Sequence, residues 1–124
     1  MISQGANILD QGRSLVEFTV TAFGRRKVTV ELKTGEKTLN LPLEQTEPNI
    51  YRGRYQEGRG KPLENLLYKF CLDGEVCYPD PYSNFQPEGV HGPSQVIDHN
   101  RYRWHDQSWP GLDLERAIIY ELHV

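Results

Sequence analysis

The stretch that decides how this chain is interpreted is DPYSNFQPEGVHGPS, residues 80–94. It holds three prolines in fifteen residues, and proline lacks the amide proton that helices and central strands require. The same stretch carries Tyr82, Phe85 and Val90, which a fully solvated loop would not need. We therefore predict a long ordered loop, here named the proline loop, that is fastened to a surface by its aromatic side chains.

Short runs of alternating or β-branched residues occupy most of the chain on either side of this loop. Turn signals built from glycine, proline, asparagine and aspartate separate the runs, as in β-sandwich proteins. The chain is therefore predicted to be all-β, an immunoglobulin-like (E-set) β-sandwich of about seven strands. The first twelve residues are predicted to be a frayed lead-in. Strands are predicted over residues 14–22, 28–32, 39–43, 50–56, 66–72, 76–78 and 95–98.

The strand predictions also assign side chains to faces of the sheets. Tyr51 and Tyr55 are expected on one face of their strand, with the neighbouring arginines on the other. Tyr68, Phe70 and Leu72 are expected to point inward from the strand that precedes the next turn. Pro42, in the middle of a predicted strand, indicates a sheet edge or a bulge.

A hairpin turn is predicted at Asp73–Gly74, one of the strongest turn signals between two strands. Such a turn places Cys71 and Cys77 opposite each other, so a disulfide is geometrically allowed. Cytosolic thiols are usually reduced, and two ordinary reduced cysteines are the favoured expectation. The sequence alone leaves their redox state open.

Length and charge exclude several classes of function. A chain of 124 residues with a net charge of −3 is long enough for one domain and has no basic excess for nucleic acid. No apolar run approaches the roughly 18 residues of a membrane span. The first residues lack the basic and apolar regions of a signal peptide, so we expect a cytoplasmic protein.

Two further runs complete the chain after the last predicted sandwich strand. Residues 101–116 are polar, contain Trp104 and Trp109, and are interrupted by Pro110-Gly111, as expected for a linker. Residues 117–124 begin with the apolar run AIIY, which is typical of a strand buried on both faces, as in a parallel barrel.

The runs FQPEGVHGPS at residues 85–94 and IIYELHV at residues 118–124 together resemble the maltooligosyltrehalose trehalohydrolase family. That family belongs to glycoside hydrolase family 13 of the α-amylase superfamily. The resemblance implies an N-terminal β-sandwich domain over residues 1–100, of the type classed with carbohydrate-binding module family 48. It further implies an interdomain linker over residues 101–116 and the first strand of a catalytic (β/α)8 barrel over residues 117–124.

The resemblance also carries expectations about activity. Enzymes of this type hold their catalytic carboxylates at the carboxyl ends of barrel strands. Those strands are absent from this sequence, so we assign no catalytic residue and expect these residues to be inactive without a barrel. The whole enzyme would hydrolyse the α-1,4 bond next to the terminal trehalose unit of a maltooligosyltrehalose and release trehalose.

Five residues are candidates for glucan binding or for docking on the barrel: Tyr82, Phe85, His91, Trp104 and Trp109. Aromatic side chains with polar rims suit pyranose rings and suit protein interfaces equally well. Docking on the barrel is favoured.

The alternatives are an α-glucan-binding module of this or a related branching or debranching enzyme, and a sandwich that binds another protein. The expected partners are the enzyme's own barrel, an α-1,4-glucan or maltooligosyltrehalose, and a second copy of the chain through the terminal strand. We expect no cofactor and no metal, since the histidines match no ligand spacing.

Overall fold

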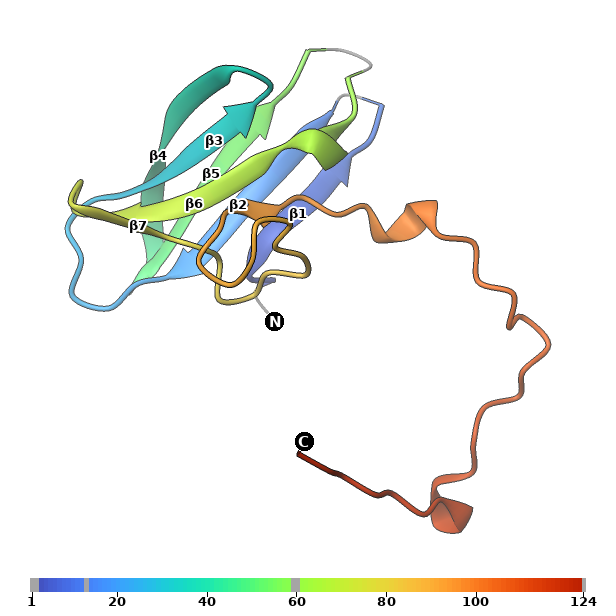
Figure 1. Cartoon of the computed structure of the whole chain (residues 1–124). Coiled ribbons are helices and arrows are strands. Elements are labelled where there is room, and N and C mark those ends of the chain that lie inside the picture. Colours follow the sequence, from blue (N-terminus) through green and yellow to red (C-terminus); the bar gives the residue numbers. More distant parts are fainter. Residues whose placement is uncertain (1–2, 13, 59–60, 124) are drawn as a thin grey trace.

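The computed structural model describes residues 3–12, 14–58 and 61–123, and these residues form eight antiparallel strands (Figure 1). The described ranges hold no helix that is long and apolar enough to cross a membrane. The strands are β1 (Gly5–Asp10), β2 (Leu15–Thr21), β3 (Val28–Thr34), β4 (Lys37–Glu47), β5 (Ile50–Gln56), β6 (Leu67–Leu72), β7 (Val76–Tyr78) and β8 (Ser94–Gln95). The short 3-10 helices are η1 (Leu63–Asn65), η2 (His99–Arg101) and η3 (Leu114–Arg116).

The strands make two layers, which confirms the predicted all-β sandwich. One layer contains β1, β2, β5 and the second half of β4. The other contains the first half of β4, then β3 and β6, with β7 and β8 along the far edge of β6. Alternate side chains of both layers point inward, and the aromatic rings of Phe18 and Tyr68 meet across the core at 5.0 Å between centroids. The fully buried apolar side chains are Val16, Phe18, Val28, Val30, Leu32 and Val96.

The predicted faces are also confirmed. Tyr68 and Phe70 are buried in the core, and Leu72 packs against it. Tyr51 is buried and Tyr55 packs against the same core. The arginines between them lie on the outer face of β5, where they form ion pairs with glutamates of β2 and β4.

β4 passes from one layer to the other. Residues 37–43 pair with β3, and Glu44 to Glu47 pair with β5. Pro42 lies in the first half, where β4 pairs with β3 alone, so the predicted sheet edge is confirmed. At the crossing, the buried side chain of Leu43 approaches Gly53 of β5, where a Cβ atom would lie only 2.5 Å from Leu43 Cδ2. The absence of a side chain at residue 53 therefore lets β4 fold over the core.

The frayed lead-in predicted over the first twelve residues is wrong for Gly5–Asp10, which form β1 and pair with β2. Ala6 and Ile8 pack against the core, so burial stabilises this strand although its apolar pattern is short. Met1 and Ile2 lie outside the described residues.

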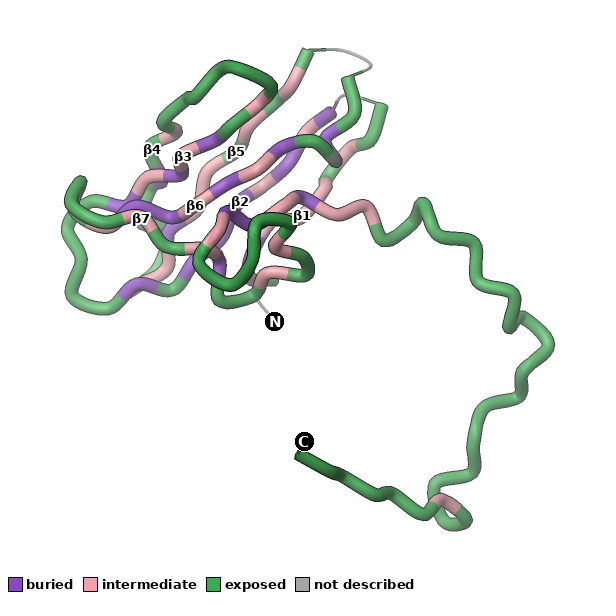
Figure 2. Tube along the Cα trace, viewed as in Figure 1, coloured by how far each residue is buried: buried purple, intermediate pink, exposed green. Residues whose placement is uncertain are grey.

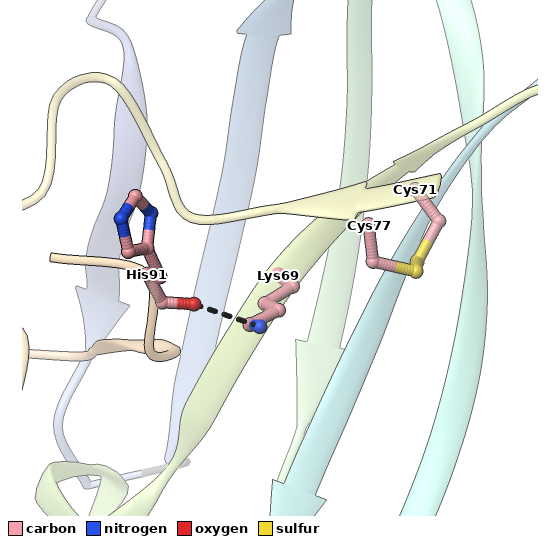
Figure 3. The surroundings of a disulfide bond; sticks show 4 residues. All are labelled: Lys69, Cys71, Cys77 and His91. Atoms are coloured by element: carbon pink, nitrogen blue, oxygen red, sulfur yellow. Dashed lines mark hydrogen bonds between the residues drawn. A yellow bond between two sulfur atoms is a disulfide. The ribbon is translucent and has the colours of Figure 1, made fainter. Parts of the chain in front are cut away.

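The predicted hairpin at Asp73–Gly74 is confirmed, with both residues at positive φ, 54° and 78°. Cys71 and Cys77 stand directly opposite each other, with their Cα atoms 3.9 Å apart, and their sulfurs are bonded (Figure 3). The favoured expectation of two reduced cysteines is therefore wrong in this structure. The register of the hairpin places the two cysteines directly opposite each other, within reach of a disulfide.

Beyond Asp98 the chain leaves the sandwich and continues as an extended arc, residues 99–123, here named the tail (Figure 1). The strand predicted over residues 117–124 is not formed by residues 117–123, which have no strand neighbour in the described part of the chain. A strand is held by hydrogen bonds to an adjacent strand, and here none runs alongside. Its assignment to a barrel stays a prediction, and Val124 lies outside the described residues. The strand predicted at residues 95–98 forms only at Gln95, in β8, which begins at Ser94.

The crossing of β4 can be tested with Gly53→Ala. We expect the free energy of unfolding to fall by about 1–3 kcal/mol, because the new methyl group overpacks against Leu43. Urea unfolding followed by circular dichroism measures the change. Gly58→Ala is the control, since a Cβ there would meet only the flexible side chain of Lys61 at 3.7 Å. Equal stability of the two variants would contradict the packing account.

Candidate docking site

The proline loop begins and ends on the same edge of one strand. β7, which precedes it, pairs with residues 70–72 of β6, and β8, which ends it, pairs with Leu67 and Tyr68. The loop therefore leaves β6 and returns to it, and its two ends lie close together although thirteen residues separate Asp80 from Ser94 in the sequence. In Figure 1 it projects from the sandwich near β1.

A buried carboxylate fastens the two ends. The Tyr68 hydroxyl donates to Asp80 Oδ2 at 2.6 Å, and the Asp80 amide donates to Ser94 Oγ at 2.9 Å. The amide of Tyr82 donates to Asp80 Oδ1 at 2.8 Å. Asp80 is only 4% exposed and Ser94 is fully buried, so water does not compete for these bonds. Gly5 of β1 lies against the same carboxylate, and a Cβ there would be 2.9 Å from Asp80 Oδ2.

Burial sets the electrostatics of this group. Loss of hydration raises the pKa of the Asp80 carboxyl, against the opposing effect of the hydrogen bonds from Tyr68 and the Tyr82 amide. Burial and the Asp80 carboxylate raise the pKa of the Tyr68 hydroxyl, which therefore remains a donor.

The proposed fastening of the loop by its aromatic residues is wrong. Tyr82 and Phe85 are 58% and 51% exposed, and Val90 is also exposed. Polar groups hold the loop instead: beside the Asp80 network, Lys69 Nζ donates to the His91 carbonyl at 3.1 Å (Figure 3). The sequence signal for Asp80 and Ser94 was weak, because short polar residues beside prolines usually mark solvated turns.

The two tryptophans lie in the tail and not against the loop. Every described residue from His99 to His123 is exposed except Ala117, which is half-buried (Figure 2). Trp104 contacts Tyr102, with ring centroids 4.9 Å apart in an edge-to-face arrangement. The five candidate residues thus form two groups, three in the proline loop and two in the tail, and the structure does not bring the groups together. Their roles stay predictions.

An apolar hollow beside the loop was not predicted. It has a volume of about 370 Å³ and is lined by Phe23, Tyr78, Pro79 and Pro81, among others. Phe23 is 76% exposed in the turn that follows β2. In the sequence, the aromatic Phe23 directly before the charged turn at residues 24–27 could have indicated this hollow. In the described part of the chain, no group of three histidine, cysteine or acidic residues is placed to hold a metal.

Tyr68→Phe tests the fastening of the loop. We expect the free energy of unfolding to fall by about 1–3 kcal/mol, because the buried carboxylate of Asp80 loses a hydrogen-bond donor. Thermal or urea unfolding measures the loss. In the control Tyr82→Phe the ring is exposed, and its stability should stay within about 0.5 kcal/mol of the parent chain. A Tyr68→Phe chain as stable as this control would show that the network is not a fastening.

The pH dependence of stability should carry the signature of Asp80. Because the pKa of Asp80 is raised in the fold, folding favours its protonated carboxyl. This contribution to stability is fully present below the ordinary aspartate pKa and is lost as the pH rises through the raised pKa. Asp80→Asn should remove this fall in urea unfolding measured across the acidic range.

Asp73→Asn should have the opposite effect on the pH dependence. The Lys27 and Arg26 amides lower the pKa of Asp73, so its contribution is present at higher pH and is lost on acidification. The same direction of change in both variants would contradict the assignment.

Comparison with known proteins places the fold and the loop in context. No protein-family model matches the chain. It is 40% identical over 95 residues to a malto-oligosyltrehalose trehalohydrolase from Arthrobacter ramosus, covering 77% of this chain and 16% of that protein. It is 47% identical over 57 residues to the Deinococcus radiodurans protein of the same name, covering 46% and 9%. The chain therefore spans less than a fifth of these relatives.

Solved structures agree with the sequence comparison. A candidate α-amylase from Salmonella typhimurium superposes with a TM-score of 0.74 at 29% identity, over 98% of this chain and 19% of the other. A type I pullulanase from Bacillus subtilis has a TM-score of 0.67 at 18% identity, over 84% and 14%, and shows a shared fold alone. The predicted resemblance is confirmed: the chain is related to one part of the maltooligosyltrehalose trehalohydrolases, glycoside hydrolase family 13 enzymes of the α-amylase superfamily.

Proposed function

We propose that this chain forms the non-catalytic amino-terminal domain of a maltooligosyltrehalose trehalohydrolase and that it docks on and supports the catalytic barrel. The observation that carries the proposal is the row of large apolar side chains exposed along the tail. They are from 63% to 97% exposed, and the sandwich covers none of them. The row consists of Tyr102, Trp104, Trp109, Leu112, Leu114, Ile118, Ile119, Tyr120 and Leu122.

Such a row is costly in water and stabilising against a protein partner. Each large apolar side chain gains about 1.5–3 kcal/mol when it is fully buried. Aromatic residues, of which the row holds four, are enriched at protein interfaces. A partner that covers the tail is therefore the simplest explanation of its composition.

The coverage of the Salmonella typhimurium protein supports a path of this kind in a larger protein. The described tail makes up residues 99–123, far more than the 2% of the chain that this superposition omits. The superposition therefore extends into the tail. The domain limits are part of the proposal: a sandwich over residues 1–100, a linker over 101–116 and a first barrel strand over 117–124.

The proposed activity belongs to the whole enzyme. Its relatives are named malto-oligosyltrehalose trehalohydrolases, and we propose that the whole enzyme releases trehalose by hydrolysing the α-1,4 bond next to the terminal trehalose unit of a maltooligosyltrehalose. The chain contributes no catalytic carboxylate in this proposal, and its role is to shape and hold the barrel. A cytoplasmic location is part of the proposal.

Tryptophan fluorescence tests docking directly, because the only two tryptophans of the chain lie in the tail. The chain would be titrated with the part of the Arthrobacter ramosus relative that follows its matched region. We expect a blue shift of the emission as Trp104 and Trp109 become buried. Ile118→Asp should weaken binding by about tenfold or more, since docking would bury an unpaired charge.

The matched control is Leu39→Asp, at an exposed apolar residue of β4 in the sandwich, which should bind as the parent chain does. Emission that does not shift on titration, or equal loss of binding in both variants, would contradict docking through the tail.

A glucan-binding module is the second candidate, favoured by the exposed edge-to-face pair of Tyr102 and Trp104. An NMR titration with maltoheptaose separates the two. Localised shifts at Trp104, Trp109 or the proline loop would support glucan binding, and an unchanged spectrum would leave docking as the function. Self-association through residues 117–124 would appear in sedimentation as a dimer that Ile118→Asp dissociates.

A further inference from the structure

The disulfide between Cys71 and Cys77 holds a strand that has little else to hold it. β7 has only three residues, and its three register pairs with β6 place the cysteine pair in the middle (Figure 3). β7 ends the strand order of its layer, so in the described part of the chain no strand covers its outer side. A two-stranded contact this short is marginal in water without a further constraint.

The two cysteine residues are unequally exposed. Cys71 belongs to the inner of the two strands and is 6% exposed. Cys77 is half-buried on the edge strand, between the exposed Val76 and Tyr78. A thiolate from solution therefore reaches Cys77 more readily than Cys71.

The strand that this bond fixes is the one from which the proline loop departs. Cys77 precedes Asp80 by three residues, and Tyr78 and Pro79 between them line the apolar hollow beside the loop. The other fastenings of the loop do not involve the disulfide: the Tyr68 hydroxyl with Asp80 Oδ2, the Asp80 amide with Ser94 Oγ, and Lys69 with the His91 carbonyl. Breaking the bond therefore loosens β7 and Tyr78, while the loop stays attached from Asp80 onward.

From this arrangement we propose that Cys71–Cys77 is a site of reversible thiol–disulfide exchange with a protein dithiol, and that its redox state controls the order of β7 and of the apolar hollow. The first thiolate of the dithiol attacks Cys77 Sγ, forms a mixed disulfide and expels Cys71 as a thiolate, which takes up a proton. The second thiol of the dithiol, once deprotonated, attacks the first thiol's sulfur within the mixed disulfide. This attack releases the Cys77 thiolate, which takes up a proton. Two electrons and two protons pass to the chain, and the dithiol becomes a disulfide.

This control extends to docking, and that extension rests on the proposed function. The hollow lined by Phe23, Tyr78 and Pro81 adjoins the proline loop, whose residues Tyr82, Phe85 and His91 are candidates for docking on the barrel. A surface that is ordered before binding loses less conformational entropy when it binds. The oxidised chain should therefore bind the barrel more tightly than the reduced chain.

The test begins with the chain alone. The native chain would be equilibrated in dithiothreitol buffers without denaturant, its thiols counted by alkylation and mass spectrometry, and its amide exchange followed by NMR. We expect complete and reversible reduction, with the amides of β7 exchanging about tenfold faster after reduction and those of β2 and β3 unchanged. A Cys71→Ser/Cys77→Ser chain should show the fast exchange with or without dithiothreitol.

Three results would overturn the proposal. The first is a bond that only denaturant makes reducible, and the second is a reduced chain whose β7 amides exchange as in the oxidised one. The third is a general loss of protection that includes β2 and β3, which would make the bond a support of the whole fold. None of these measurements needs the barrel, so a failure of the redox proposal can be distinguished from a failure of docking. With the barrel present, about tenfold weaker binding of the reduced chain is expected, and equal binding would refute the extension.

Discussion

The hydrogen bond from the Tyr68 hydroxyl to the Asp80 carboxylate connects the core of this protein to its most unusual surface segment. The Tyr68 ring packs on Phe18 in the middle of the sandwich, and its hydroxyl reaches the start of the proline loop. A carboxylate that is 4% exposed is stable only if its oxygens are bonded, and Tyr68 and the Tyr82 amide supply those bonds. The position of the loop therefore depends on the same residue that completes the core.

The topology around β6 explains why a loop of this length can be ordered. Two short strands, β7 and β8, share one edge of β6, so the loop between them is closed at its base by the sheet itself. Closing a loop costs entropy, which here is offset by the ladder bonds, by the Ser94 hydroxyl and by the disulfide. What projects from this base is a set of exposed side chains, and the tail continues the same kind of surface beyond the sandwich (Figure 2). The proposed docking function rests on the exposed apolar groups of the tail.

The sandwich was predictable because its strands have clear period-two patterns and its hairpin at Asp73–Gly74 has a strong turn signal. β1 was not, because Ala6 and Ile8 are few apolar residues in a polar run, and only tertiary packing makes them a strand. The fastening of the proline loop was misassigned for a related reason: sequence reasoning favours aromatic anchors, whereas the anchor is a buried carboxylate that needs partners from β6 and β8. Predicting the disulfide required the strand register and the redox state of the cysteines. The turn at Asp73–Gly74 indicated the register, but no sequence pattern encodes the redox state. The exposed apolar row of the tail was visible in the composition of the sequence.

Amide hydrogen exchange of the tail and the proline loop, measured on the chain alone and on its complex with the barrel of a relative, tests the central claim most directly. The account predicts rapid exchange from residue 99 onward in the isolated chain, and protection of residues 102–122 and of the loop in the complex. Protection of the tail in the isolated chain would mean that the sandwich already covers it. If complex formation protected amides elsewhere but left those of the tail and the loop in rapid exchange, the domain would contact its barrel through another face. Either result would contradict the account.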